Sequence, residues 1–138
     1  MEVRRLDGKA SEVSPKVTGR LVTVEGEHPA AWQVPEESPV AVLVNGESFA
    51  VMMATPADLE DFAVGFALTE GIVPAAAKIE SLRIGEASDG YLLNLRVSDR
   101  LAEASRDRKR SIAGRSGCGI CGAQTIEAAV PRPPRVAG

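Results

Sequence analysis

The stretch PVAVLVNGESFAVMMA, residues 39–54, decides the fold expected for this chain. Two apolar runs of strand length flank Asn45 and Gly46, the pair most typical of a two-residue β-hairpin turn because both residues tolerate a positive φ. The runs are almost continuously apolar instead of alternating with polar residues. We therefore predict a hairpin whose two strands are covered on both faces.

The next stretch, TPADLEDFAVGFALTEG at 55–71, has the signals of a buried helix. Thr55 is a suitable N-cap, and Asp58 is placed to reach back toward it. Apolar residues then recur at helical spacing until Gly71, a residue typical of helix ends. Gly65 in the middle of the helix costs about 1 kcal/mol relative to alanine, so we expect a close packing neighbour there.

Further elements are expected on both sides of this core. Residues 79–85 and 91–97 alternate around a Ser-Asp-Gly turn and predict a second hairpin. Upstream, the pattern predicts a loose arm over 1–15, a first strand over 17–25 and a loop over 26–38. The order of elements gives an α+β fold in which two β-hairpins flank one buried helix, followed by a flexible CxxC loop and a short helix.

The chain of 138 residues has the size of a single domain. Within it we distinguish four segments: an N-terminal arm with the first strand at 1–35, an α+β core at 36–100, a basic linker with the CxxC loop at 101–122, and a short helix with a proline-rich tail at 123–138.

Composition excludes several classes of function. The net charge of −3 argues against general nucleic-acid binding, which needs a basic surface. No apolar run approaches the roughly 18 residues needed to cross a bilayer, and the N-terminus lacks the apolar core of a signal peptide. We therefore predict a cytoplasmic protein with no membrane and no nucleic-acid partner. In that compartment two cysteines indicate catalysis or metal binding more than a structural disulfide.

Both cysteines lie in SGCGICG, residues 116–122. C-x-x-C spacing brings two sulfurs onto one bend of backbone, which suits half a metal site, a reversible disulfide or a thiol relay that carries sulfur. The basic run at 108–110, Arg115 and the short helix that follows all favour a thiolate. We therefore expect the chemistry of this protein at Cys118 and Cys121.

A metal site is the main alternative for the cysteine pair. Structural zinc normally takes four ligands, and His28 is the only histidine of the chain. A Cys₄ site would therefore be shared between two copies, in a non-catalytic dimer with paired CxxC knuckles. A thioredoxin-like site fits less well, because the segment before the cysteines is charged and glycine-rich instead of a core strand.

Three blocks of this sequence resemble the formate dehydrogenase accessory sulfurtransferase family (FdhD). They are EESP with VNGE, then TP, ED, GF and TEGI, and finally GRSGCGICG, in this order between residues 36 and 122. The resemblance implies a sulfur carrier required for formate dehydrogenase activity. Such a carrier takes persulfide sulfur from a cysteine desulfurase and transfers it to the molybdenum bis-guanine-dinucleotide cofactor before insertion of the cofactor into the enzyme.

The resemblance also implies roles for single residues. Cys118 corresponds to the persulfide carrier, and Cys121 would resolve the persulfide or hold it as a second acceptor. Arg115 would bind the phosphates of the cofactor, since arginine grips phosphate bidentately. Family members are longer, and their cofactor-binding motif lies in a C-terminal half, so we expect a fragment, a truncated product or one of two separately encoded halves. We also expect a homodimer and no permanently bound metal.

Overall fold

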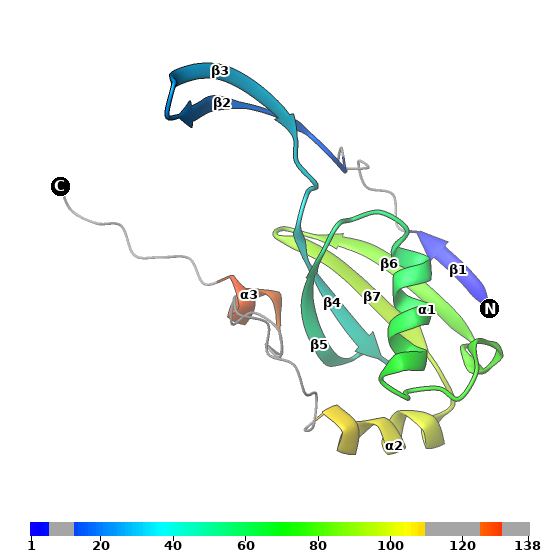
Figure 1. Cartoon of the computed structure of the whole chain (residues 1–138). Coiled ribbons are helices and arrows are strands. Elements are labelled where there is room, and N and C mark those ends of the chain that lie inside the picture. Colours follow the sequence, from blue (N-terminus) through cyan, green and yellow to red (C-terminus); the bar gives the residue numbers. More distant parts are fainter. Residues whose placement is uncertain (6–12, 110–124, 131–138) are drawn as a thin grey trace.

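Residues 1–5, 13–109 and 125–130 are described by the structure, a computed structural model (Figure 1). Its centre is a mixed five-stranded sheet. In spatial order the strands are β1 (Glu2–Arg5), β6 (Ser81–Ala87), β7 (Gly90–Arg96), β4 (Ser38–Val44) and β5 (Glu47–Ala54). The β4–β5 and β6–β7 pairs are antiparallel hairpins, and β4 joins β7 in parallel. The α+β class and both predicted hairpins are confirmed.

The β4–β5 hairpin turns as the sequence predicts. Asn45 has a φ of 51° and Gly46 a φ of 87°, so both occupy the left-handed region that the turn requires. The strands are also covered on both faces. Val42 belongs to the core on one face, whereas Ala41 and Val51 belong to a second apolar cluster on the other face. A short helix, α3 (Ile126–Ala129), supplies the remaining residues of that second cluster.

Helix α1 (Leu59–Thr69) covers one face of the sheet (Figure 1). Its buried side chains are Leu59, Ala63, Phe66 and Ala67. The ring of Phe66 meets that of Phe49 edge to face, with centroids 5.9 Å apart, an arrangement that aromatic pairs favour. Gly71 follows the helix with a φ of 66°, which confirms the predicted end.

The predicted start of this helix is wrong. The helix begins at Leu59 instead of directly after Thr55, and Asp58 is its N-cap, with a φ of 49° and no side-chain capping bond. The Thr55 carbonyl instead accepts a hydrogen bond at 2.8 Å from the amide of Ala57, which forms a tight turn. The left-handed backbone at Asp58 therefore separates the capping signals from the helix itself.

Only one side of α1 is buried, which corrects a second prediction. Gly65 is exposed, and a Cβ added there would meet no atom within 4 Å in the described part of the chain. The expected close neighbour is therefore not found among these residues. Leu68, on the same outer side, is 41% exposed. The apolar residues of this helix outnumber the positions that the sheet can cover.

Two strands in the N-terminal region were not predicted. β1 pairs in parallel with β6, where the sequence predicts a loose arm. β3 (Gly26–Gln33) pairs along its whole length with the predicted first strand, β2 (Lys16–Thr23), although the sequence predicts a loop there. The β2–β3 hairpin forms a separate two-stranded sheet that extends away from the central sheet (Figure 1). Pro29 and the absence of alternation conceal β3 in the sequence.

Beyond the second hairpin, the charged segment forms a helix, α2 (Asp99–Lys109). The sequence left a short helix and a loop open for this segment. A single turn of 3₁₀ helix, η1 (Ala76–Lys78), connects α1 to β6. Among the described residues, no helix is both long and apolar enough to cross a membrane.

Candidate functional site

The residues on which the predicted chemistry depends, Cys118, Cys121 and Arg115, lie outside the described residues. The structure does describe both flanks of the segment that carries them. Helix α2 precedes the segment and α3 follows it. Both helices are attached to the β4–β5 hairpin, by different side chains and on different sides.

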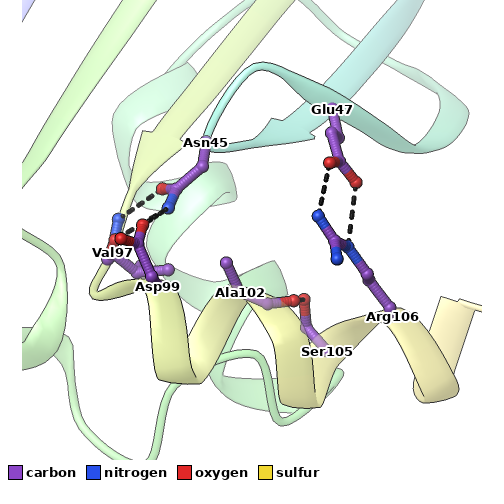
Figure 2. Close-up of polar contacts among 7 residues, drawn as sticks. All are labelled: Asn45, Glu47, Val97, Asp99, Ala102, Ser105 and Arg106. Atoms are coloured by element: carbon purple, nitrogen blue, oxygen red, sulfur yellow. Dashed lines mark hydrogen bonds and ion pairs between the residues drawn. The ribbon is translucent and has the colours of Figure 1, made fainter.

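The side chain of Asn45 ties the β4–β5 turn to the start of α2 (Figure 2). Its Nδ2 donates to the carbonyl of Val97 at 3.0 Å and to Oδ1 of Asp99 at 3.3 Å. Its Oδ1 accepts from the amide of Val97 at 2.9 Å. Val97 is buried, so Asn45 satisfies backbone groups that water does not reach. One amide side chain thereby fixes the junction between β7 and α2.

The C-terminal part of α2 is held by an ion pair with Glu47, which follows the β4–β5 turn. Arg106 donates from Nε to Oε2 of Glu47 at 3.1 Å and from Nη2 to Oε1 at 2.6 Å (Figure 2). This bidentate hydrogen bond, followed by the charge of Glu47, raises the pKa of Arg106. Both side chains are exposed, so the pair orients the helix more than it stabilises the fold.

The inner side of α2 completes a hollow of about 370 Å³ against the ends of the strands. Ser105, 2% exposed, donates from Oγ to the carbonyl of Ala102 at 2.7 Å and so is satisfied within the helix. Leu101 and Ala102 pack against the main core. The hollow is lined by both charged and apolar side chains, among them Phe49 and Arg96.

The other flank, α3, is attached by apolar packing. Ile126 and Ala129 are 6% and 9% exposed, and they cluster with Ala41 and Val51 of the β4–β5 hairpin. Ala129 also donates its amide to the carbonyl of Thr125 at 3.0 Å. The helices on either side of residues 110–124 are therefore both attached to one hairpin, α2 at its turn and α3 on its sheet face.

The sequence did not reveal these attachments. It presented Asn45 as a turn former and Glu47 as part of a family block, and no local signal links either residue to a helix more than 50 residues away. The zinc alternative stays a prediction as well. The described residues contain no group of three or more His, Cys, Asp or Glu that could hold a metal, and the cysteines are not among them.

The geometry defines a class: an α+β protein in which a single hairpin anchors both flanks of a cysteine-bearing segment. Comparison with known sequences identifies the family. The sequence model of the FdhD/NarQ family matches residues 35–137, which include both cysteines. The chain belongs to the FdhD/NarQ family.

Several curated relatives carry the name sulfur carrier protein FdhD. The chain is 47% identical over 121 residues to the one from Agrobacterium fabrum, covering 86% of this chain and 44% of that protein. It is 48% identical over 95 residues to the one from Cupriavidus necator, covering 69% of this chain and 33% of that protein. The relative from Xanthomonas axonopodis pv. citri is 45% identical over 116 residues, covering 84% of this chain and 39% of that protein. The chain thus spans less than half the length of these relatives.

A solved structure supports the fold. It is the crystal structure of a protein from Desulfotalea psychrophila that is described as a candidate formate dehydrogenase accessory protein. The two structures align with a TM-score of 0.52 at 24% identity, covering 62% of this chain and 36% of the other. At this identity the similarity concerns the arrangement of the elements alone.

Proposed function

We propose that this chain is the sulfur-carrying part of a sulfurtransferase that serves formate dehydrogenase, with Cys118 as the persulfide site. One observation carries the proposal: the family match includes both cysteines, and relatives of 45–48% identity are named sulfur carrier proteins. The anchoring of both flanks on the β4–β5 hairpin supports it. Such anchoring gives a cysteine segment a fixed base from which to meet a donor and then an acceptor.

The proposed loading step is a displacement at sulfur. The Cys118 thiolate attacks the outer sulfur of a persulfide on a cysteine desulfurase, a new S–S bond forms at Cys118 Sγ, and the donor cysteine leaves as a thiolate. The exchange needs no external oxidant or reductant, because the donor persulfide is reduced to a thiolate as the Cys118 thiolate is oxidised to a persulfide. Cys121 then acts in one of two ways. As a second acceptor it takes the outer sulfur and leaves Cys118 as a thiolate; as the resolving thiol it attacks Cys118 Sγ, so that a Cys118–Cys121 disulfide forms and hydrosulfide leaves.

The proposed acceptor is the molybdenum bis-guanine-dinucleotide cofactor, with Arg115 as a contact to its phosphates. The corresponding partners are a cysteine desulfurase, a formate dehydrogenase and a second copy of the chain. We propose the cytoplasm as the site of action, because reducing conditions there keep a CxxC pair available as thiols.

Mass spectrometry after loading tests the persulfide site. The protein is incubated with a cysteine desulfurase and cysteine, and its intact mass is measured before and after reduction. We expect a gain of about 32 Da, the mass of one sulfur atom on a thiolate, that reduction removes. Cys118→Ala should lose the gain, whereas Cys121→Ala should still load. Equal loading of the two single variants and of the double variant would refute the assignment.

The role of Arg115 is tested by thiol alkylation. If its charge stabilises the Cys118 thiolate, Arg115→Ala should slow alkylation at neutral pH. Arg108→Ala is the matched control, because it removes an arginine farther from the cysteine along the chain. Alkylation rates that are the same for wild type and Arg115→Ala from pH 6 to 9, a range that brackets the free thiol pKa of about 8.5, would remove Arg115 from the site.

A further inference from the structure

Asn45 and Gly46, the turn residues of the β4–β5 hairpin, form a dipeptide with chemistry of its own. In an Asn-Gly pair the backbone nitrogen of glycine attacks Cγ of the asparagine side chain. The nitrogen loses its proton, ammonia leaves, and a cyclic succinimide forms, which water then opens to aspartate or isoaspartate. Glycine favours this deamidation because it has no Cβ to hinder the attack. Neither step needs an enzyme, an oxidant or a reductant.

The fold holds both reacting groups in place. The leaving group, Nδ2 of Asn45, donates to the carbonyl of Val97 at 3.0 Å and to Oδ1 of Asp99 at 3.3 Å (Figure 2). The attacking nitrogen, that of Gly46, donates to Oδ1 of Asn94 at 3.0 Å. Ring closure must bring Cγ of Asn45 to bonding distance from this nitrogen, and the side-chain hydrogen bonds resist that movement. Docking of α2 at the turn therefore slows deamidation.

The product of the reaction does not fit the same position. In aspartate an oxygen replaces Nδ2, and this oxygen faces two acceptors, the carbonyl of Val97 and the carboxylate of Asp99. Val97 is buried, so its carbonyl loses a donor that water does not readily replace. Isoaspartate disturbs the turn further, because the main chain then runs through the side-chain carbon and lengthens a turn built on two successive positive φ angles.

The charges around the turn do not compensate for a new carboxylate. The hollow between α2 and the strand ends has three acidic and two basic lining residues: Glu47, Asp99, Glu103, Arg96 and Arg106. Arg106 is already bound by both oxygens of Glu47. Conversion of Asn45 makes the balance four to two and increases the repulsion. Arg83 and Arg96 line a second hollow beside the turn, and a carboxylate that rotated toward them would also leave α2.

We infer that Asn45 is a site of spontaneous deamidation, that docked α2 protects it, and that its conversion releases the start of α2. The reaction runs in one direction, because the ammonia is lost to solvent. A molecule in which α2 has opened long enough to react is thereby changed permanently. Since α2 precedes the segment that carries the cysteines, the change affects one flank of that segment. The inference goes beyond the sulfur-carrier function and does not depend on it.

Peptide mapping by mass spectrometry tests the protection. The full chain and a synthetic peptide that spans the turn are incubated at mildly alkaline pH, and conversion of Asn45 is followed. We expect the chain to convert at least about tenfold more slowly, because local opening must precede reaction. Leu101→Ala removes a contact of α2 with the core and should speed conversion. Arg106→Gln breaks an exposed ion pair and should do so more weakly without endangering the fold.

Leu68→Ala is the matched control for these variants, since it shortens an exposed leucine of α1 and should leave the conversion rate unchanged. Equal rates in the chain and the peptide overturn the inference. Rates in Leu101→Ala and Arg106→Gln that both match wild type overturn it as well, because the turn would then be protected without α2.

Hydrogen exchange in the full chain tests the release of α2. Asn45→Asp is the direct product, and aspartate tolerates the positive φ of this position. Amides of α2 should exchange about tenfold faster in this variant, with those of β6 unchanged. Asn94→Asp is the matched control, because its Oδ1 can still accept from Gly46, and exchange in α2 should stay as in wild type. Unchanged exchange in Asn45→Asp, or equal acceleration in both variants, overturns the inference.

Discussion

The β4–β5 and β2–β3 hairpins have strands of nearly equal length but very different surroundings. Val42 of β4 is fully buried, whereas Val22 of β2 is 70% exposed. β4–β5 lies between α1 and α3, while β2–β3 stands clear of the central sheet (Figure 1). Strand pairing thus arises from local turns and backbone bonds, but burial requires other layers of the fold. A two-stranded hairpin alone is marginally stable in water.

The exposed hairpin has its own asymmetry. From the register, Val17, Leu21 and Trp32 share one face of β2–β3, and all three are between 42% and 48% exposed. The other face carries the ion pair of Arg20 with Glu27, at 2.9 Å. The apolar face of β2–β3 therefore resembles a core strand without its cover. Matched substitutions in the two hairpins measure how much burial by other layers of the fold contributes to stability.

Substitutions in the turns of the two hairpins should show the largest difference in the free energy of unfolding. Asn45→Ala removes three side-chain hydrogen bonds, two of them to the buried Val97, and places alanine at a φ of 51°. We expect it to lower the free energy of unfolding by about 3 kcal/mol. Thr23→Ala in the turn of β2–β3 removes only exposed hydrogen bonds, to the amide of Glu25 and the carbonyl of Gly26. It should change the free energy of unfolding by less than about 0.5 kcal/mol.

Urea unfolding followed by circular dichroism measures both turn variants. Asn45→Gly separates the two causes, because glycine accepts the positive φ and loses only the hydrogen bonds. It should therefore be more stable than Asn45→Ala. Equal loss of stability in Asn45→Ala and Thr23→Ala would show that the anchoring of α2 contributes nothing to the fold.

Substitution of one valine in each hairpin should give the next largest difference in stability. Val42→Ala leaves a cavity in the core and should destabilise the fold by about 2 kcal/mol. Val22→Ala removes the same atoms from a side chain that is 70% exposed, and we expect a change of about 0.5 kcal/mol or less. The same unfolding curves test both variants. Val22 lies on the face of β2–β3 that carries Arg20 and Glu27, so a comparable loss for Val22→Ala would mean that this face is covered in solution by a second molecule.

Helix α1 offers a smaller effect of opposite sign. Gly65 is exposed with no described atom near its added Cβ, so Gly65→Ala should stabilise the protein by up to about 1 kcal/mol. Thermal unfolding should then show a higher midpoint. A lower midpoint would indicate that a partner, or another part of the chain, packs closely against this side of α1.

Breaking the exposed ion pair of Glu47 with Arg106 should have the smallest effect on stability, and this effect should depend on salt concentration. Glu47→Gln should reduce stability slightly at low ionic strength and should match wild type in molar salt, because exposed charges are screened. Glu27→Gln, which breaks the ion pair of the β2–β3 hairpin, is the control and should behave alike. A loss that persists at high salt would mean that Glu47 acts through more than its charge.

Part of this molecule was predictable because the determining contacts are local. The Asn45-Gly46 turn, the end of α1 at Gly71 and the β6–β7 hairpin each depend on residues within a few positions of one another. The same holds for the cysteine pair, whose predicted role comes from its spacing and its family block alone. Cys118 and Cys121 therefore remain predictions from the sequence, and the structure adds only how their flanks are anchored.

The remaining features were decided by tertiary contacts, because their partners lie far away in the sequence. The amide of Asn45 bonds to Val97, 52 residues on, and Glu47 to Arg106, 59 residues on. β1 is a strand only because β6 offers it an edge, and Gly65 is exposed only because the sheet covers one side of α1. Local sequence fixes where the backbone turns. Which side chains are buried, and which charges pair with each other, depends on how the layers assemble.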